Sequence, residues 1–239
     1  ELSANLLIYL PKSNQPVPIF LGLNFLGNHT TGKDPAIILK ESYTIKKDKT
    51  IMTEKGRGIS ARRWPAEELI KRGYGLITIH CSDFDPDFHD GFKNGVHGLL
   101  ETGDTLSTIG AWTWGLSRVM DYLETDKTID HKRVAVIGHS RLGKTALWTG
   151  ASDDRFALAI SNNSGCGGAA YSRRKKGETL AVMNKSFPHW FNKKYKVYSD
   201  KEDQMPFDQH MLIAAIAPRP VYVASASKDL WADPTGEHY

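Results

Sequence analysis

Short apolar runs that end in turn-type residues recur along the chain and predict strands at residues 5–10, 17–21, 74–79, 134–137, 156–160 and 221–224. Between them, apolar residues recur at three- and four-residue steps, most clearly over 106–123 after the candidate cap Asp104. Residues 65–73 begin with proline and end with glycine, as helices often do. Strands that alternate with helices, several of them apolar on both faces, predict an α/β class with a mostly parallel sheet covered by helices on both faces.

Two long segments, 28–63 and 171–203, show little periodicity, and loops of that length in a compact domain are usually functional or disordered. The chain has 239 residues and no internal repeat, so we predict one domain over residues 1–239. Its final residues predict a turn or the start of a helix. We therefore expect the last strand of the sheet to be missing from this sequence.

Composition narrows the functional classes. Hydrophobic residues make up 40% and charged residues 24%, which is typical of a globular domain, and the net charge of +4 is too small to favour a nucleic-acid partner. No window approaches the roughly 20 apolar residues of a membrane helix, so we expect no membrane partner. Basic residues at 173–176 and 193–196 are expected to form solvated loop faces, with an acidic substrate as the alternative. Cys81 and Cys166 allow one disulfide at most, and their pairing stays open.

Two motifs overlap in the stretch 134–148. The residues from Gly138 to Thr145 satisfy the phosphate-binding loop pattern, with a strand before and a helix after. The same residues place Ser140 at a sharp strand-to-helix turn, the nucleophile elbow of α/β-hydrolases. In that second pattern Leu142 stands where the usual second glycine would be, and Gly143 follows one position later.

The surroundings of the motif favour the elbow. A phosphate loop needs a partner strand that ends in a Mg²⁺-binding aspartate, and it normally follows the first strand of its domain. Here several strands precede the motif, and the strand at 156–160 runs into Ser161 with no acid. The strand at 221–224 instead leads to Asp229, in the serine-then-acid order of α/β-hydrolases. A phosphate-loop nucleotide-binding module is the alternative.

The chain also carries blocks that are specific in combination: Gly-His-Ser-Arg-Leu-Gly-Lys at 138–144, Asn-Ser-Gly-Cys-Gly-Gly-Ala-Ala-Tyr-Ser-Arg-Arg at 163–174, Asp-Gln-His-Met at 208–211, Ala-Pro-Arg-Pro at 217–220 and Asp-Leu-Trp-Ala-Asp-Pro at 229–234. With these blocks the chain resembles the bacterial glucuronoyl esterases of carbohydrate esterase family 15. The likeness extends from about Val17 to the last residue.

The resemblance implies an α/β-hydrolase that cleaves the ester between 4-O-methyl-glucuronic acid of glucuronoxylan and lignin alcohols, without a metal or an organic cofactor. It implies that Ser140 is the nucleophile and that Arg141 contributes to the oxyanion hole through its backbone N–H and its side chain. Lys144 corresponds to a sugar-hydroxyl contact. Glu178 and Trp231 match further substrate-contacting positions.

The departures from the family pattern concern the acid and the base. Many members carry a glutamate where this chain has Asn163, so the expected acid is Asp229, a position that a subset of the family uses. The family's histidine lies several tens of residues beyond the acid, whereas this sequence stops ten residues after Asp229. We therefore expect the base beyond Tyr239 and expect no histidine of this chain to serve, with His139 packed beneath the turn.

Other candidate functional residues have weaker support in the sequence. The stretch 83–87 imitates a calcium loop, but Phe88 occupies its glycine position and Asn94 its bidentate glutamate position, so we expect a turn and no metal. Cys166, between glycines, is expected to be a small packing residue. Three tryptophans in helical patterns are expected in the core: Trp112, Trp114 and Trp148.

The sequence thus predicts a secreted or periplasmic serine esterase that acts as a monomer on plant cell-wall material. Within this class, the alternative is an acetyl-xylan esterase or another carbohydrate esterase. From other classes, a nucleotide-binding module and an inactive carbohydrate-binding relative also stay open.

Overall fold

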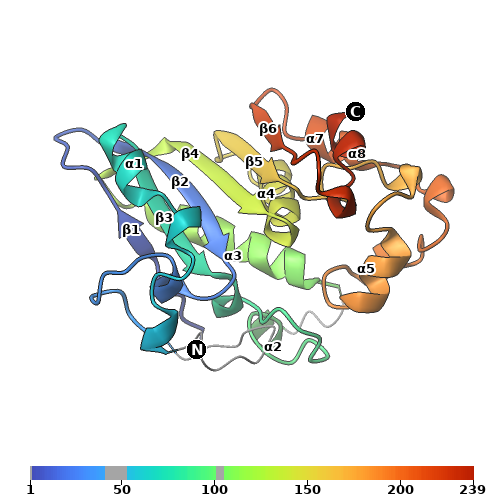
Figure 1. Ribbon diagram of the computed structural model, residues 1–239, viewed down its shortest axis with the longest axis horizontal. Coiled ribbons are helices and arrows are strands. Elements are labelled where there is room, and N and C mark those ends of the chain that lie inside the picture. Colours follow the sequence, from blue (N-terminus) through green and yellow to red (C-terminus); the bar gives the residue numbers. More distant parts are fainter. Residues whose placement is uncertain (1, 41–52, 101–104) are drawn as a thin grey trace.

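The computed structural model describes residues 2–40, 53–100 and 105–239, which form one six-stranded sheet of order β1-β3-β2-β4-β5-β6 (Figure 1). Only β1 runs antiparallel to its neighbour, and the remaining pairs are parallel. The strands are β1 Leu7–Tyr9, β2 Val17–Asn24, β3 Gly75–His80, β4 Ile129–His139, β5 Leu158–Asn162 and β6 Val221–Ala224. All six predicted strands are confirmed, and the polar residues before Val134 extend β4 toward its start.

The helices of the described residues are α1 Ala66–Lys71, α2 His97–Leu100, α3 Thr108–Leu123, α4 Arg141–Ser152, α5 Leu180–Ser186, α6 Lys193–Lys196, α7 Gln209–Ala214 and α8 Pro234–His238. Short 3-10 turns lie at Asn28–Thr30, Glu54–Gly56, Ala61–Arg63, Cys81–Asp83, Ser172–Arg174, Glu202–Gln204 and Leu230–Ala232. The side chain of Ser107 caps α3 by accepting a hydrogen bond from the Gly110 N–H. The expected cap Asp104 lies outside the described residues.

The hydrophobic core lies between the sheet and the pair α3 and α4, which pack on each other while α4 also covers β4 and β5. Trp112 is fully buried there, as expected, and Trp114 is partly buried against the core. The expectation for Trp148 is wrong because this residue lies on the outer face of α4 and is 48% exposed. Figure 1 shows α1 beside β2 and β3, and α7 and α8 beside the opposite edge strand, β6.

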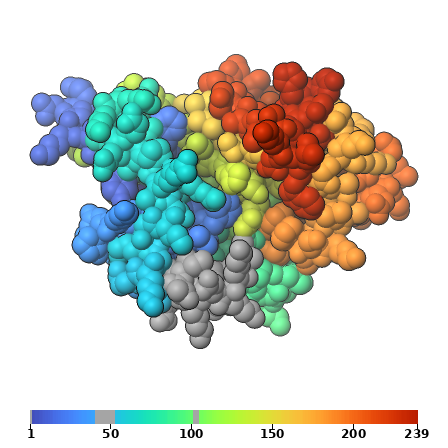
Figure 2. All heavy atoms as spheres, in the orientation of Figure 1, coloured from blue at the N-terminus to red at the C-terminus, as the bar shows by residue number. Residues whose placement is uncertain are grey.

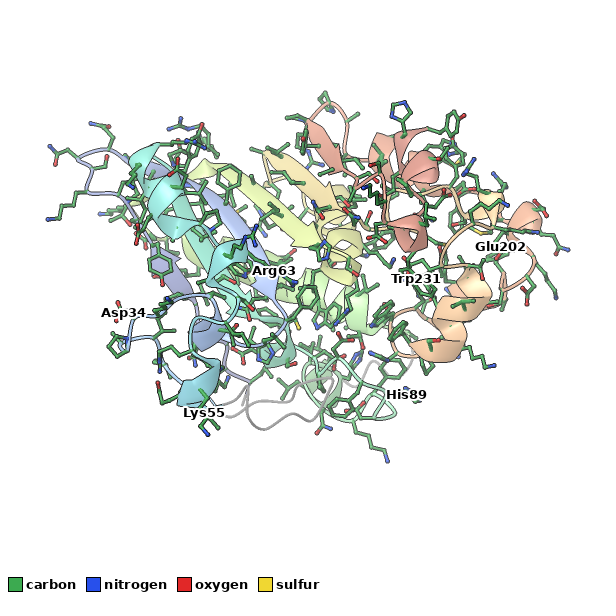
Figure 3. The ribbon with its side chains drawn as sticks, in the orientation of Figure 1. Asp34, Lys55, Arg63, His89, Glu202 and Trp231 are labelled. Carbon is green, nitrogen blue, oxygen red and sulfur yellow. The ribbon has the colours of Figure 1, made fainter. Side chains whose placement is uncertain are left out.

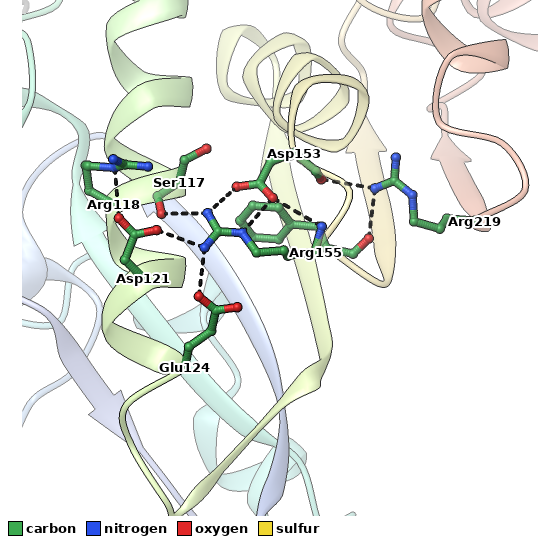
Figure 4. A network of polar contacts seen from close by, with 8 residues as sticks. Ser117, Arg118, Asp121, Glu124, Asp153, Arg155 and Arg219 are labelled. Carbon is green, nitrogen blue, oxygen red and sulfur yellow. Dashed lines mark hydrogen bonds and ion pairs between the residues drawn. The ribbon is translucent and has the colours of Figure 1, made fainter.

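An arginine-centred network fixes the loop between α4 and β5 (Figure 4). The Arg155 guanidinium pairs with Asp153 and reaches across to Asp121 and Glu124 at the end of α3. The bonds to these carboxylates outweigh the effect of partial burial and raise the pKa of Arg155 above its usual value. The network lies at the amino end of β5, so its role is to join α3 to the sheet.

The segment 171–203, which shows little periodicity in the sequence, is partly helical in the structure. It contains α5 and α6, which are too short for their periodicity to stand out in the sequence, and part of the segment 28–63 lies outside the described residues. Cys81 and Cys166 are buried free thiols and do not pair. Among the described residues, no helix has the length and apolar character needed to cross a membrane.

Candidate active site

Ser140 alone forms the turn between β4 and α4. Its backbone has φ 57° and ψ −129°, a combination that residues other than glycine rarely adopt. The Ser140 N–H donates to the Asn162 carbonyl at 2.9 Å. The turn is so tight that a Cβ on Gly138 would come within 1.9 Å of the Leu142 carbonyl oxygen, which explains the glycine. A one-residue turn is a nucleophile elbow, and it leaves no loop of successive N–H groups to wrap a phosphate.

The strand register brings the predicted nucleophile and acid to the same edge of the sheet. His139 pairs with Asn162, and Asn162 pairs with Ala224, so β4, β5 and β6 end in line. Ser140 follows β4, and Asp229 lies in the loop after β6. Since neighbouring strands lie about 4.8 Å apart, the two outer strands of this trio are separated by about 10 Å, with the end of β5 between them.

Asn163 occupies that middle position and clamps the loop that carries the acid. Its backbone is left-handed with φ 46°, a conformation that asparagine tolerates better than most residues. Its Nδ2 donates to Asp229 Oδ2 at 2.7 Å, and its Oδ1 accepts from the Ala226 N–H at 3.2 Å. The amide therefore fixes one oxygen of the Asp229 carboxylate.

Arg141, the first residue of α4, is held from three sides. Its Nε donates to Asp87, and its guanidinium lies 4.6 Å from the Phe25 ring centroid and 5.5 Å from that of Trp190. Burial alone would raise the pKa of Asp87, but hydrogen bonds from His189 and Trp190 and the charge of Arg141 hold it below its usual value. As the first helical residue, Arg141 also has a backbone N–H without an acceptor inside the helix.

Lys144 and Glu178 form a buried ion pair one helical turn further along α4. The Lys144 ammonium donates to Glu178 Oε1 and to the Ser164 carbonyl, and the side chains are 1% and 7% exposed. Two of its three N–H donors are thereby used, and the third has no hydrogen-bond acceptor among the described residues. A Cβ on Gly165, which has φ +60°, would come within 2.3 Å of Glu178 Oε1, so this glycine leaves room for the pair.

Trp231 lies in the turn Leu230–Ala232 and is 54% exposed. Its carbonyl accepts the Glu178 N–H at 2.8 Å, which ties its loop to the loop of the buried acid. Figure 3 labels Trp231 in the red C-terminal segment, on the side that faces α5. In Figure 2 the yellow-green atoms around β4 and α4 reach the surface between the cyan N-terminal half and the red and orange C-terminal segments.

No histidine completes the site. In the described part of the chain, Ser140 Oγ has no hydrogen-bond partner, so none of the nine histidines is bonded to it. The expectation for His139 is wrong, since its ring is exposed beside the turn, with Nδ1 2.8 Å from Asn162 Oδ1. His189 is buried and bonds to Asp87 at 3.0 Å. The described residues also contain no group of side chains suited to a metal ion.

The sequence-based prediction of the site consists of Ser140, Arg141, Lys144, Glu178, Asp229 and Trp231. It did not include the residues that contact these side chains. Asp87 belongs to the stretch expected to be a turn, and the structure buries its side chain beside Arg141. The Asp-Pro-Asp sequence at 85–87, in the loop after β3, was the available signal, because carboxylates at the carboxyl edge of a parallel sheet often face the site. Nothing in the local sequence indicates that Phe25 and Trp190 flank Arg141.

Comparisons with known proteins identify the family of the chain. The sequence model of the family "Glucuronyl esterase, fungi" matches residues 66–238. The chain belongs to the glucuronoyl esterase family. Over 98% of its length it is 56% identical to the carbohydrate esterase MZ0003 of an unknown prokaryotic organism, covering 57% of that protein. It is 31% identical to the 4-O-methyl-glucuronoyl methylesterase of Cerrena unicolor, again over 98% of this chain and 53% of the relative.

A solved glucuronoyl esterase from Solibacter usitatus superposes with a TM-score of 0.91 and 47% identity, over 98% of this chain and 62% of that one. The predicted α/β-hydrolase fold and the resemblance to glucuronoyl esterases are thus confirmed. The chain spans somewhat more than half the length of these curated relatives.

Proposed function

We propose that the protein is a serine carboxylic-ester hydrolase that cleaves esters of 4-O-methyl-glucuronic acid. The observation that carries the proposal is the strained one-residue turn that presents Ser140, with Arg141 directly after it at the carboxyl edge of the sheet. The name of the Cerrena unicolor relative, a 4-O-methyl-glucuronoyl methylesterase, supports the uronate part of the substrate.

In the proposed reaction Ser140 Oγ attacks the carbonyl carbon of the ester while a general base takes its proton. The carbonyl oxygen becomes an oxyanion, which the Arg141 backbone N–H and guanidinium stabilise. The bond to the alcohol oxygen then breaks, and the protonated base gives its proton to the departing alcohol. Water, activated by the same base, attacks the uronoyl-enzyme and releases the free glucuronate and Ser140.

The acid and the base have separate sources in this proposal. Asp229 is the acid that orients the base, and Asn163 holds one of its oxygens so that the other faces the base. None of the nine histidines hydrogen-bonds to Ser140 Oγ in the described residues, which supports the proposal that a histidine outside residues 1–239 is the base. A protein limited to these residues should bind a glucuronate yet hydrolyse its esters far below about 1 s⁻¹.

Binding of the sugar falls to Lys144, Glu178 and Trp231. The third N–H of the Lys144 ammonium and the carboxylate of Glu178 are suited to sugar hydroxyls, and the exposed indole of Trp231 is suited to stacking on a sugar face. We extend the proposal to the ester between glucuronoxylan and lignin alcohols, cleaved without a cofactor by a secreted or periplasmic monomer. An acetyl-xylan esterase would instead prefer an acetyl ester.

The test is Ser140→Ala in the full-length protein, assayed on benzyl glucuronate and on p-nitrophenyl acetate. Loss of the nucleophile should lower kcat for the uronate ester by roughly 10⁴ to 10⁶-fold. The control is Ser152→Ala, an exposed serine at the far end of the same helix, which should leave kcat unchanged. Retention of a tenth of the activity by Ser140→Ala would contradict the mechanism, and a preference of the wild type for the acetyl ester would contradict the substrate.

A further inference from the structure

Asp87 is a buried acid that performs no step of the reaction proposed above. It follows β3 and the turn Cys81–Asp83, and its side chain is 3% exposed. We infer that Asp87 is a positioning residue, which holds the Arg141 guanidinium by its Nε so that its two terminal nitrogens face the oxyanion formed on Ser140. The inference rests on the proposed function, because it assigns a role within that reaction.

The Asp87 carboxylate is also held by two side chains other than Arg141. Its Oδ1 accepts hydrogen bonds from His189 Nε2 at 3.0 Å and from Trp190 Nε1 at 2.8 Å. Its Oδ2 is thereby directed at Arg141 Nε. A carboxylate that accepts hydrogen bonds from three side chains is held in one orientation. The direction of its bond to Arg141 Nε is therefore fixed as well.

The two faces of the guanidinium are covered as well. The Phe25 and Trp190 rings lie 4.6 and 5.5 Å from it, and Trp190 is itself stacked on Phe187 with ring centroids 3.8 Å apart. With Nε occupied, Nη1 and Nη2 have no hydrogen-bond partner among the residues that the structure describes. The Arg141 side chain is 17% exposed, so these donors remain within reach of a ligand.

Pre-orientation matters because a free arginine would have to be ordered when the oxyanion forms. Donors that are already aimed at the developing charge need no reorganisation at that moment, which is the main source of oxyanion stabilisation. Loss of an ion pair with a purely structural role should leave kcat nearly unchanged. Asp83 and Lys40 form such a pair, in which Lys40 Nζ lies 3.0 Å from Asp83 Oδ1. Asp83 lies four residues before Asp87, its side chain is equally buried, and it bonds to neither Ser140 nor Arg141 in the described residues.

The first experiment compares Asp87→Asn with Asp83→Asn in the full-length protein on a glucuronate ester. Asp87→Asn should lower kcat by about 10 to 100-fold and change KM by less than about threefold, since the oxyanion exists only in the transition state. Asp83→Asn should leave kcat within about twofold. An unchanged kcat in Asp87→Asn, or an equal loss in both variants, would overturn the inference.

The second experiment asks whether the effect passes through Arg141. In an Arg141→Ala background, Asp87→Asn should lower kcat by less than about twofold further, because the group it positions is already absent. Losses that multiply in the double variant would show a general structural role. This outcome differs from a failure of the proposed function, which Ser140→Ala reports by itself.

A third measurement needs no altered Asp87. In ¹⁵N-labelled wild-type protein, the Nε–H signal of Arg141, assigned by its loss in Arg141→Lys, should exchange with water at least about tenfold more slowly than that of Arg62. Arg62 is exposed, and its side chain has no hydrogen-bond partner among the described residues. Equal exchange rates would mean that Asp87 does not hold Arg141 in solution, and the inference would fall.

Discussion

The buried ion pair of Lys144 and Glu178 allows a sharp prediction about stability. Lys144→Ala removes the ammonium and leaves the Glu178 carboxylate in a position where its side chain is only 7% exposed. Breaking a buried pair by removing one partner costs about 3–5 kcal/mol, because the remaining charge has lost both water and partner. For a domain of this length, that loss should lower Tm by about 6–20 °C.

The same pair complicates any attempt to measure sugar binding with single substitutions. A lower affinity of Lys144→Ala for a glucuronate would combine a lost contact with a loosened site. Lys144→Met/Glu178→Met replaces the pair by neutral side chains of similar volume, and such replacements are often close to neutral for stability. We expect this double variant to recover at least half of the lost stability while its affinity for methyl glucuronate stays low.

The assay is urea unfolding followed by calorimetric titration with methyl glucuronate. Lys185→Ala, at an exposed lysine on α5, is the control and should change the free energy of unfolding by less than about 0.5 kcal/mol. A loss below about 1 kcal/mol in Lys144→Ala would show that the pair does not form in solution. If the double variant were as unstable as the single one, the unpaired charge would not be the cause.

Three further predictions concern other parts of the molecule. Asp229→Asn should lower kcat by on the order of 10⁴, and adding Asn163→Asp should restore part of it, because the donor and acceptor of the 2.7 Å bond exchange places; no recovery in kcat would refute the exchange. Arg155→Ala should cost about 2–3 kcal/mol in urea unfolding, against less than about 1 for Arg118→Ala, because Arg155 joins three carboxylates and is 28% exposed. Burial lowers the pKa of His80 to about 4, despite the opposing charge of a nearby aspartate, so the unfolded chain binds a proton between pH 6.5 and 4 that the folded chain does not. The free energy of unfolding should therefore fall by roughly 3 kcal/mol as pH decreases through that window. If His80→Gln shows the same dependence of this free energy on pH, His80 is not the cause.

The features that the sequence predicted are those with a local signal. Six apolar runs indicated six strands, and the parallel order followed from their alternation with helices. The elbow was recognisable because a glycine two residues before Ser140 is required by the close approach of the Leu142 carbonyl. Trp148 shows the limit of this reasoning, since an apolar residue in a helical pattern does not reveal which face of the helix is covered.

The features that escaped prediction are contacts between distant segments. Lys144 and Glu178 are 34 residues apart, and Asp87 and Arg141 are 54 apart. The sequence shows which residues can form ion pairs. The partner of each residue depends on how the loops after different strands fold over the edge of the sheet. No periodicity in the sequence encodes that arrangement.

The position of Arg141 and Lys144 on α4 explains why each is paired with an acid from a loop. Arg141 and Lys144 both lie in the first turn of α4, where the positive end of the helix dipole disfavours a cation. Asp87 from the loop after β3 and Glu178 from the segment after β5 offset that repulsion. The sheet and the turn therefore fix the position of Ser140, while the loops after β3 and β5 determine how the Arg141 and Lys144 side chains are oriented. Substitutions in those loops should change oxyanion stabilisation or sugar affinity one at a time without moving Ser140.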